Sequence, residues 1–269
     1  MRTIRITGTG SALPGRIVTN KELEQMVETS DEWIRERTGI GERHVSVGET
    51  VVALASEAAR KALEQAGKRA EEIDLILVAT CSPEQYLPCC ACQVQADIGA
   101  VNALAFDVNA ACSGFLFALN TADAYLRMGL AENALIIGSE VLSKLVDWTD
   151  RGSCILFGDG AGAVVVERCK AESRAVECGN DLAETEKGMQ ETAEEKRIPA
   201  AGILGRALHS DGTGGGVLQC GARELTTPYV GTSAAKTDQN QPTNDREHYI
   251  QMDGQEVYRF ATRRVPQCI

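Results

Sequence analysis

Residues 105–115 read Ala-Phe-Asp-Val-Asn-Ala-Ala-Cys-Ser-Gly-Phe. The apolar start is typical of a strand, the small residues after it are typical of a sharp turn, and the apolar rhythm that follows predicts a helix. Cys112 therefore lies where a strand turns into a helix, whose free N–H groups and dipole stabilise a thiolate. We interpret Cys112 as an activated nucleophile. The alternative is that Cys112, one of ten cysteines, is simply a small buried apolar residue without a chemical role.

The segments around this turn alternate between strands and helices. Residues 74–80 and 134–138 are continuous apolar runs, which are typical of buried parallel strands. Thr50 has the position of a helix cap, and the helix that follows is expected to end at Gly67. The other expected elements are strands over residues 3–8, 105–108, 164–166 and 202–208 and helices over residues 20–28, 31–38, 92–99, 113–128 and from 254 onward. This alternation predicts an α/β protein.

Composition divides the chain into three parts. Residues 1–169 carry the strand and helix pattern and the nucleophile. Residues 170–200 are rich in Glu, Ala and Lys and have little apolar rhythm, so we expect an acidic insertion or linker there. Apolar segments return in residues 201–269. We therefore expect an N-terminal half with the nucleophile, a linker, and a shorter C-terminal half.

Length, composition and charge exclude several classes of protein. A chain of 269 residues that is 43% hydrophobic can bury a large core. Its net charge of −11 disfavours nucleic-acid binding, because phosphate would be repelled. An anionic partner would need a local basic patch, for which the candidates are Arg35, Arg37, Arg43, Lys144 and Arg151. No apolar run approaches the ~20 residues of a membrane span. Scattered cysteines and the absence of a secretory leader favour reduced thiols in the cytoplasm.

Two short motifs invite interpretations that we reject. Gly8-Thr-Gly10 follows a strand, as in a dinucleotide-binding turn, but Leu13 stands at the third glycine position. Cys89 and Cys92 have the spacing of metal ligands, yet no second pair completes a four-ligand site, so we expect no metal. We also expect no redox pair, because the spacing lacks the usual strand-to-helix setting.

The three histidines, His44, His209 and His248, lie in loop-like surroundings. None is an obvious base for Cys112, although a nucleophilic cysteine is usually paired with a base or with oxyanion donors. The catalytic partner of Cys112 therefore remains unassigned by sequence patterns.

Six segments in order resemble those of the β-ketoacyl-acyl-carrier-protein synthase III family, which has the thiolase fold. They are Thr29-Ser-Asp-Glu-Trp-Ile with Arg37-Thr-Gly-Ile, Cys92-Gln-Val-Gln, Ala105-Phe-Asp-Val with Ala110-Ala-Cys-Ser-Gly-Phe, Thr149-Asp-Arg-Gly, Phe157-Gly-Asp-Gly-Ala-Gly-Ala and Met252-Asp-Gly-Gln-Glu-Val. The resemblance implies a thiolase-like, layered αβαβα fold built from two related halves, of which the second is incomplete here.

The same resemblance implies an acyltransferase that starts fatty acid synthesis. Cys112 would take an acyl group from acyl-CoA and join it to malonyl-acyl carrier protein with loss of CO2, without a resident cofactor. Trp33 and Arg151 would sandwich the CoA adenine, and Thr29 and Arg37 would help to hold the nucleotide. Leu87 would reach across a homodimer to line the partner's acyl pocket.

The resemblance also implies that the chain is incomplete. Members of that family continue into strands that carry a Pro-His-Gln-Ala-Asn segment and a later Asn, whose side chains stabilise the oxyanion and the enolate. This chain lacks these segments before Ile269, so we expect it to be inactive in condensation on its own. Two alternatives stay open. One is another thiolase-superfamily enzyme, such as a thiolase or a plant-polyketide-synthase-like or hydroxymethylglutaryl-CoA-synthase-like enzyme. The other is a non-catalytic subunit that pairs with an intact relative.

Overall fold

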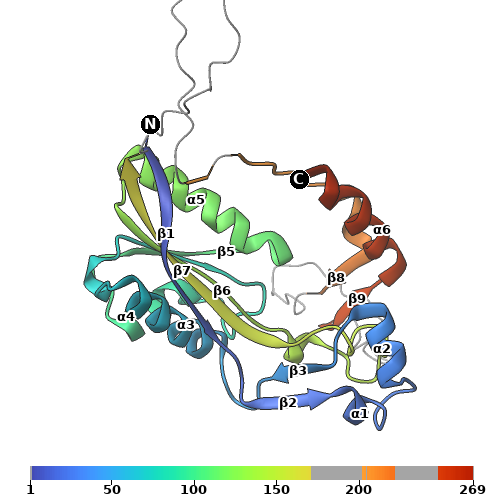
Figure 1. Ribbon diagram of the computed structural model, residues 1–269. Helices are drawn as coiled ribbons and strands as arrows, with labels where there is room; N and C mark the ends of the chain where they lie inside the picture. Colours follow the sequence, from blue (N-terminus) through green and yellow to red (C-terminus); the bar gives the residue numbers. More distant parts are fainter. Residues whose placement is uncertain (1, 171–201, 204, 222–247, 269) are drawn as a thin grey trace, which may run out of the picture.

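A five-stranded mixed sheet forms the centre of the molecule (Figure 1). The computed structural model describes residues 2–170, 202–203, 205–221 and 248–268. The strands follow the order β1, β7, β6, β4, β5 across the sheet. Their bounds are Arg2–Ala12 for β1, Leu75–Ala79 for β4, Leu104–Val108 for β5, Asn133–Val141 for β6 and Asp159–Lys170 for β7.

The middle of the sheet is parallel, as the two apolar runs predicted. β4 pairs in parallel with both β5 and β6, whereas β7 runs antiparallel to β6 and to β1. Every residue of β4 is buried, because helices cover both faces of the sheet. The strand expected over residues 164–166 is longer in the structure, because β7 begins at Asp159 and includes Gly160 and Gly162. These glycines pair directly with β6, as Gly162 does with Gly138.

Helices cover the two faces of the sheet (Figure 1). α3, Val51–Ala66, and α4, Cys90–Ile98, lie on one face, and α5, Gly114–Met128, lies on the other. α3 has the predicted bounds, with Thr50 accepting from Ala53 N at its start and Gly67 in the left-handed conformation at its end. On α5, Ala118, Ala122 and Leu126 face the core, whereas Leu116 is 55% exposed.

Gly8 and Gly10 allow α3 to pack directly on β1. A Cβ atom at Gly8 would lie 2.2 Å from the carbonyl oxygen of Ala62, and one at Gly10 would lie 2.2 Å from that of Ala58. Real Cβ atoms do not approach an oxygen so closely, so only glycine fits at either position. The Gly-Thr-Gly motif therefore serves helix–strand contact, which agrees with the rejection of a dinucleotide site.

A small unit beside the sheet carries two short helices. β2, Arg16–Thr19, pairs with β3, Glu42–Val45. Thr19 and Glu22 form a capping box at the start of α1, which covers Asn20–Leu23 and is shorter than the expected helix over residues 20–28. α2 covers Asp31–Thr38 as predicted. Its cap is Ser30, whose side chain accepts from the backbone N–H of Trp33.

The described C-terminal part is small and largely exposed. It comprises β8, Leu218–Cys220, which pairs with β9, Ile250–Met252, and α6, Gly254–Arg264. The strand expected over residues 202–208 is wrong for the residues described there, which form no strand. In the part of the chain that the structure describes, no strand pairs with these residues. Most of the expected linker over residues 170–200 lies outside the described residues, and the division into two halves stays a prediction.

Short 3-10 turns connect several of these elements. Their bounds are Ala70–Glu72 for η1, Ala111–Ser113 for η2, Leu142–Leu145 for η3, Gly212–Val217 for η4 and Val265–Cys268 for η6. Among the helices of the described ranges, none is long and apolar enough to cross a membrane.

Candidate active site

Cys112 lies in the 3-10 turn η2, between the end of β5 and the start of α5, as predicted. Its side chain is exposed. The turn is tight, because Ala111 adopts a φ of +44°, which a residue with a side chain rarely does. Backbone strain of this kind clusters at functional sites. The arrangement presents the thiol to solvent at the carboxyl edge of the parallel strands.

Gly114 sets how closely this turn approaches the sheet. A Cβ atom on Gly114 would lie 3.1 Å from the Cβ of Ala79, the last residue of β4. The first turn of α5 thus packs on the end of the neighbouring strand. This contact fixes the height of Cys112 above the sheet.

Asp107 joins the nucleophile strand to α4, a role that sequence patterns did not reveal. It is five residues before Cys112 in sequence. Its carboxylate accepts from the backbone N–H groups of Cys90 (2.9 Å) and Ala91 (2.7 Å), which have no partner inside the helix. An acidic residue inside an apolar strand was the available signal, because a buried carboxylate needs donors.

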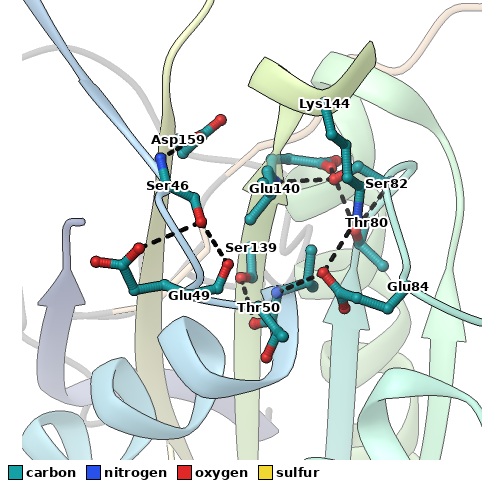
Figure 2. Close-up of polar contacts among 12 residues, drawn as sticks. Ser46, Glu49, Thr50, Thr80, Ser82, Glu84, Ser139, Glu140, Lys144 and Asp159 are labelled. Atoms are coloured by element: carbon teal, nitrogen blue, oxygen red, sulfur yellow. Dashed lines mark hydrogen bonds and ion pairs between the residues drawn. The ribbon is translucent and has the colours of Figure 1, made fainter. Parts of the chain in front are cut away.

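Glu140, near the end of β6, organises the loop that follows β4 (Figure 2). Its carboxylate accepts from the Cys81 backbone N–H (2.8 Å), from Thr80 Oγ1 (3.2 Å) and from the Ser82 hydroxyl. Burial, with Glu140 as the next cause, raises the pKa of the Cys81 thiol to about 12, and the charge of Cys112 contributes less. Cys81 therefore stays protonated near the nucleophile at neutral pH.

A second carboxylate, Glu84, links this loop to α3 (Figure 2). It accepts from the backbone N–H of Val51 (2.9 Å) and from Lys144 Nζ (3.0 Å). Lys144, a candidate for an anion-binding patch, is therefore already paired with an acidic group. Its ammonium holds Glu84 in the loop that follows β4.

Trp33, Arg37 and Arg151 come together in the structure. The guanidinium carbon of Arg37 lies 4.4 Å from the Trp33 ring centre, and that of Arg151 lies 4.6 Å from it. Arg37 comes from α2, one turn after Trp33, whereas Arg151 comes from a distant turn and donates to the Glu28 carbonyl (3.0 Å). Two cations thus stack on one indole.

Thr29 lies just before α2, and its Oγ1 is buried without a hydrogen-bond partner. A buried hydroxyl without a partner is costly, so this atom is suited to contact a bound group.

Arg43 differs from the other arginines of its segment. It is 5% exposed and donates to Val18 O, Asn20 Oδ1 and Ile155 O, so the expectation that it joins an anion-binding patch is wrong.

Leu87 is 85% exposed in the loop before α4. It contacts neither Cys112 nor the Trp33 cluster through any interaction that the structure describes. The edge strand β5 exposes Leu104, and α5 exposes Leu116, by 53% and 55% respectively. These apolar side chains lie on elements that flank the nucleophile turn.

The histidines do not supply a base to Cys112 within the described part of the chain. His44 bonds through Nδ1 to the Pro14 carbonyl (2.6 Å), and His209 and His248 are exposed.

A cavity of about 290 Å³ lies along α6, and none of the predicted site residues lines it. Its lining residues are Asp211, Glu256, Arg259, Phe260, Arg263 and Arg264.

Comparison with known proteins identifies the family. A model of 3-oxoacyl-[acyl-carrier-protein] synthase III matches residues 106–181. A β-ketoacyl-[acyl-carrier-protein] synthase III of Clostridium acetobutylicum is 43% identical over 98% of this chain and 69% of its own length. That of a Synechococcus species is 44% identical over 98% of this chain and 67% of its own length. The chain belongs to the β-ketoacyl-acyl-carrier-protein synthase III family.

Solved structures of synthase III proteins have the same fold. That of Aquifex aeolicus has a TM-score of 0.73 and 38% identity, covering 95% of this chain and 66% of the solved chain. That of Thermus thermophilus has a TM-score of 0.74 and 33% identity, covering 96% of this chain and 68% of the solved chain. The predicted α/β, thiolase-like fold is thus confirmed. The chain spans about two thirds of the length of these synthase III proteins.

Two expectations about the synthase III resemblance are not confirmed. The relatives match nearly the whole chain, and they give no support for an inactive or incomplete protein. The expected lack of the His and Asn segments is likewise not confirmed. Both stay predictions.

Proposed function

We propose that this protein transfers an acyl group from acyl-CoA to Cys112 as the first half of a synthase III reaction. The Cys112 thiolate attacks the thioester carbonyl, the bond from that carbon to the CoA sulfur breaks, and CoA leaves as its thiolate. The exposed Cys112 in a strained turn between strand and helix, in a chain of this family, supports the proposal.

In the second half, the acyl group would pass to malonyl-acyl carrier protein. Loss of CO2 from the malonyl group leaves an enolate, whose carbon attacks the Cys112 thioester and releases the thiolate. This step needs donors for the oxyanion and the enolate.

Labelling with radioactive acetyl-CoA tests the first half-reaction. We expect label on the wild-type chain and none on Cys112→Ser, because serine lacks the thiolate nucleophile. Cys220→Ser is the matched control, since Cys220 is also exposed and the label should persist. Label that persists in Cys112→Ser, or a folded wild type that takes none, would refute the proposal. Adding malonyl-acyl carrier protein and measuring the ketoacyl product tests condensation separately.

For the CoA nucleotide, the proposed site is the Trp33 cluster. An adenine between Trp33 and Arg151 needs roughly 7 Å between their planes, about twice the contact distance of carbon atoms. The present distance of 4.6 Å is shorter. Adenine would therefore displace the Arg151 guanidinium outward and take over its stacking, while Arg37 stays on the ring and Thr29 Oγ1 gains a partner.

A homodimer is the proposed assembly, in which Leu87 of one protomer lines the acyl pocket of its partner. The high exposure of Leu87, together with the apolar edge at Leu104 and Leu116, supports this assembly. Leu87→Phe would then make the acyl pocket smaller, so that only acyl-CoAs with shorter chains label Cys112. An unchanged chain-length profile would contradict this role.

A further inference from the structure

Cys89 and Cys92 span the first turn of α4. Cys89 is the N-cap residue, and Cys92 is the third residue of the helix. The Gln93 N–H donates to the Cys89 carbonyl (3.2 Å), which ties Cys89 to this turn. The helix begins at Cys90 rather than at the expected residue 92. The pair thus occupies a helix start, a setting that the sequence did not predict.

Residues three apart at a helix start are neighbours on the helix surface, so the side chains of Cys89 and Cys92 lie on the same side of this turn. Interaction with the Cys89 side chain is the first cause that raises the pKa of Cys92, ahead of burial and of the Asp107 charge. For the other described cysteines with a raised pKa, burial is the first cause. Cys92 also donates to the Ala105 carbonyl (3.6 Å), so its thiol is held in place.

Cys90, which lies between them, does not compete for a partner. It is buried, and burial raises the pKa of its thiol to about 12. Cys89 and Cys92 are themselves partly exposed. A small oxidant from solvent therefore reaches the outer pair and not the thiol between them.

We propose that Cys89 and Cys92 form a redox-active dithiol that small-molecule disulfides oxidise reversibly. The Cys89 thiolate attacks one sulfur of the small disulfide, whose S–S bond breaks, and one small thiolate leaves and takes up a proton. The Cys92 thiol then loses its proton and attacks the Cys89 sulfur. The Cys89–Cys92 bond forms and the second small thiol leaves, so two cysteine thiols are oxidised and one small disulfide is reduced.

Oxidised glutathione is the probe, and mass spectrometry is the measurement. The full chain is incubated with it and then unfolded in guanidinium chloride, so that iodoacetamide blocks every remaining thiol, including the buried Cys90. Chymotrypsin, which cuts after Tyr86 and Phe106, then releases residues 87–106. We expect this peptide to lack two hydrogens and to carry one acetamide group, on Cys90. Prior treatment with dithiothreitol should restore three acetamide groups.

Two variants separate this pairing from other thiol chemistry. In Cys92→Ser, glutathione should remain on Cys89, because no second thiol displaces it. In the matched control Cys90→Ser, the disulfide should still form. Cys89→Ser keeps a good N-cap residue and should lose both products. Three acetamide groups on the oxidised wild-type peptide, stable glutathione on its Cys89, or a bond that includes Cys90 would overturn the proposal.

Discussion

At the scale of single residues, Trp33 is the side chain on which nucleotide binding depends in the proposed function. Stacking on an indole contributes about 1–2 kcal/mol when the site is partly dry. Trp33→Ala should therefore raise the acyl-CoA concentration that half-saturates Cys112 labelling by about tenfold, which corresponds to about 1.4 kcal/mol. The maximal labelling rate should change much less, because Trp33 does not touch the reacting thiol in the structure.

Arg35→Ala is the control for this measurement. Arg35 lies on the same helix, but it pairs with Asp31 (2.9 Å) and not with the Trp33 ring. Removal of the Arg35 side chain breaks only an exposed ion pair, so the half-saturating acyl-CoA concentration should stay within about twofold of the wild-type value. Equal effects of Trp33→Ala and Arg35→Ala would place the nucleotide elsewhere.

The cysteines should differ strongly in their rates of alkylation. Cys112 is exposed, whereas burial raises the pKa of Cys81 and Cys90 to about 12. At about pH 8 their thiolate fraction is roughly one in ten thousand, and the thiolate is the reactive form. A time course with iodoacetamide should label Cys112 at least about a hundredfold faster than either. Similar rates would mean that the nucleophile turn is covered.

At the scale of elements, the contact of β1 with α3 is the most sensitive to substitution. Gly10→Ala would place a methyl group 2.2 Å from the Ala58 carbonyl, so the helix must move away from the strand. We expect a loss of about 3 kcal/mol or more in the free energy of unfolding, measured with urea. Gly15→Ala is the control, because no atom lies within 4 Å of the added carbon. Equal stabilities would show that α3 does not rest on β1.

Elements that depend on neighbours in sequence could be predicted, and those that depend on distant partners could not. Thr50 caps α3, and Cys112 lies in the turn between a strand and a helix, because local residues fix these features. The strand expected at residue 202 fails because pairing requires a second strand. The start of α4 at Cys90 also depends on a distant group, the Asp107 carboxylate.

At the scale of the whole molecule, the exposed edge of the sheet bears on assembly. β5 is the last strand in the order, and Leu104 on it is 53% exposed. If the protein is a homodimer through this edge, Leu104→Asp would bury a charge in the interface and should raise the dissociation constant of the dimer at least about tenfold. Analytical ultracentrifugation measures that constant. Val47→Asp is the control on an exposed residue outside the sheet. A dimer that Leu104→Asp leaves intact would use another surface.

Some residues of the candidate site could be predicted from the sequence, and others could not. The place of Arg151 beside Trp33 was expected from family resemblance, because no local pattern connects residues more than a hundred positions apart. Arg37 differs, since it lies four residues after Trp33 on one helix. Arg43 was wrongly expected on the surface, because its hydrogen-bond partners are also distant in sequence. A cation in a polar segment suggests a surface patch, and only the fold shows that its donors are used inside. The assembly and the cytoplasmic location stay predictions.

The contact of Gly8 and Gly10 with α3 also limits how this protein can evolve. The obstructing atoms are main-chain oxygens of Ala62 and Ala58, which every amino acid carries. Trimming a neighbouring side chain therefore cannot compensate for a larger residue at either glycine. In a library of all single substitutions, these two positions should accept no replacement, and second-site suppressors should have to shift the helix itself.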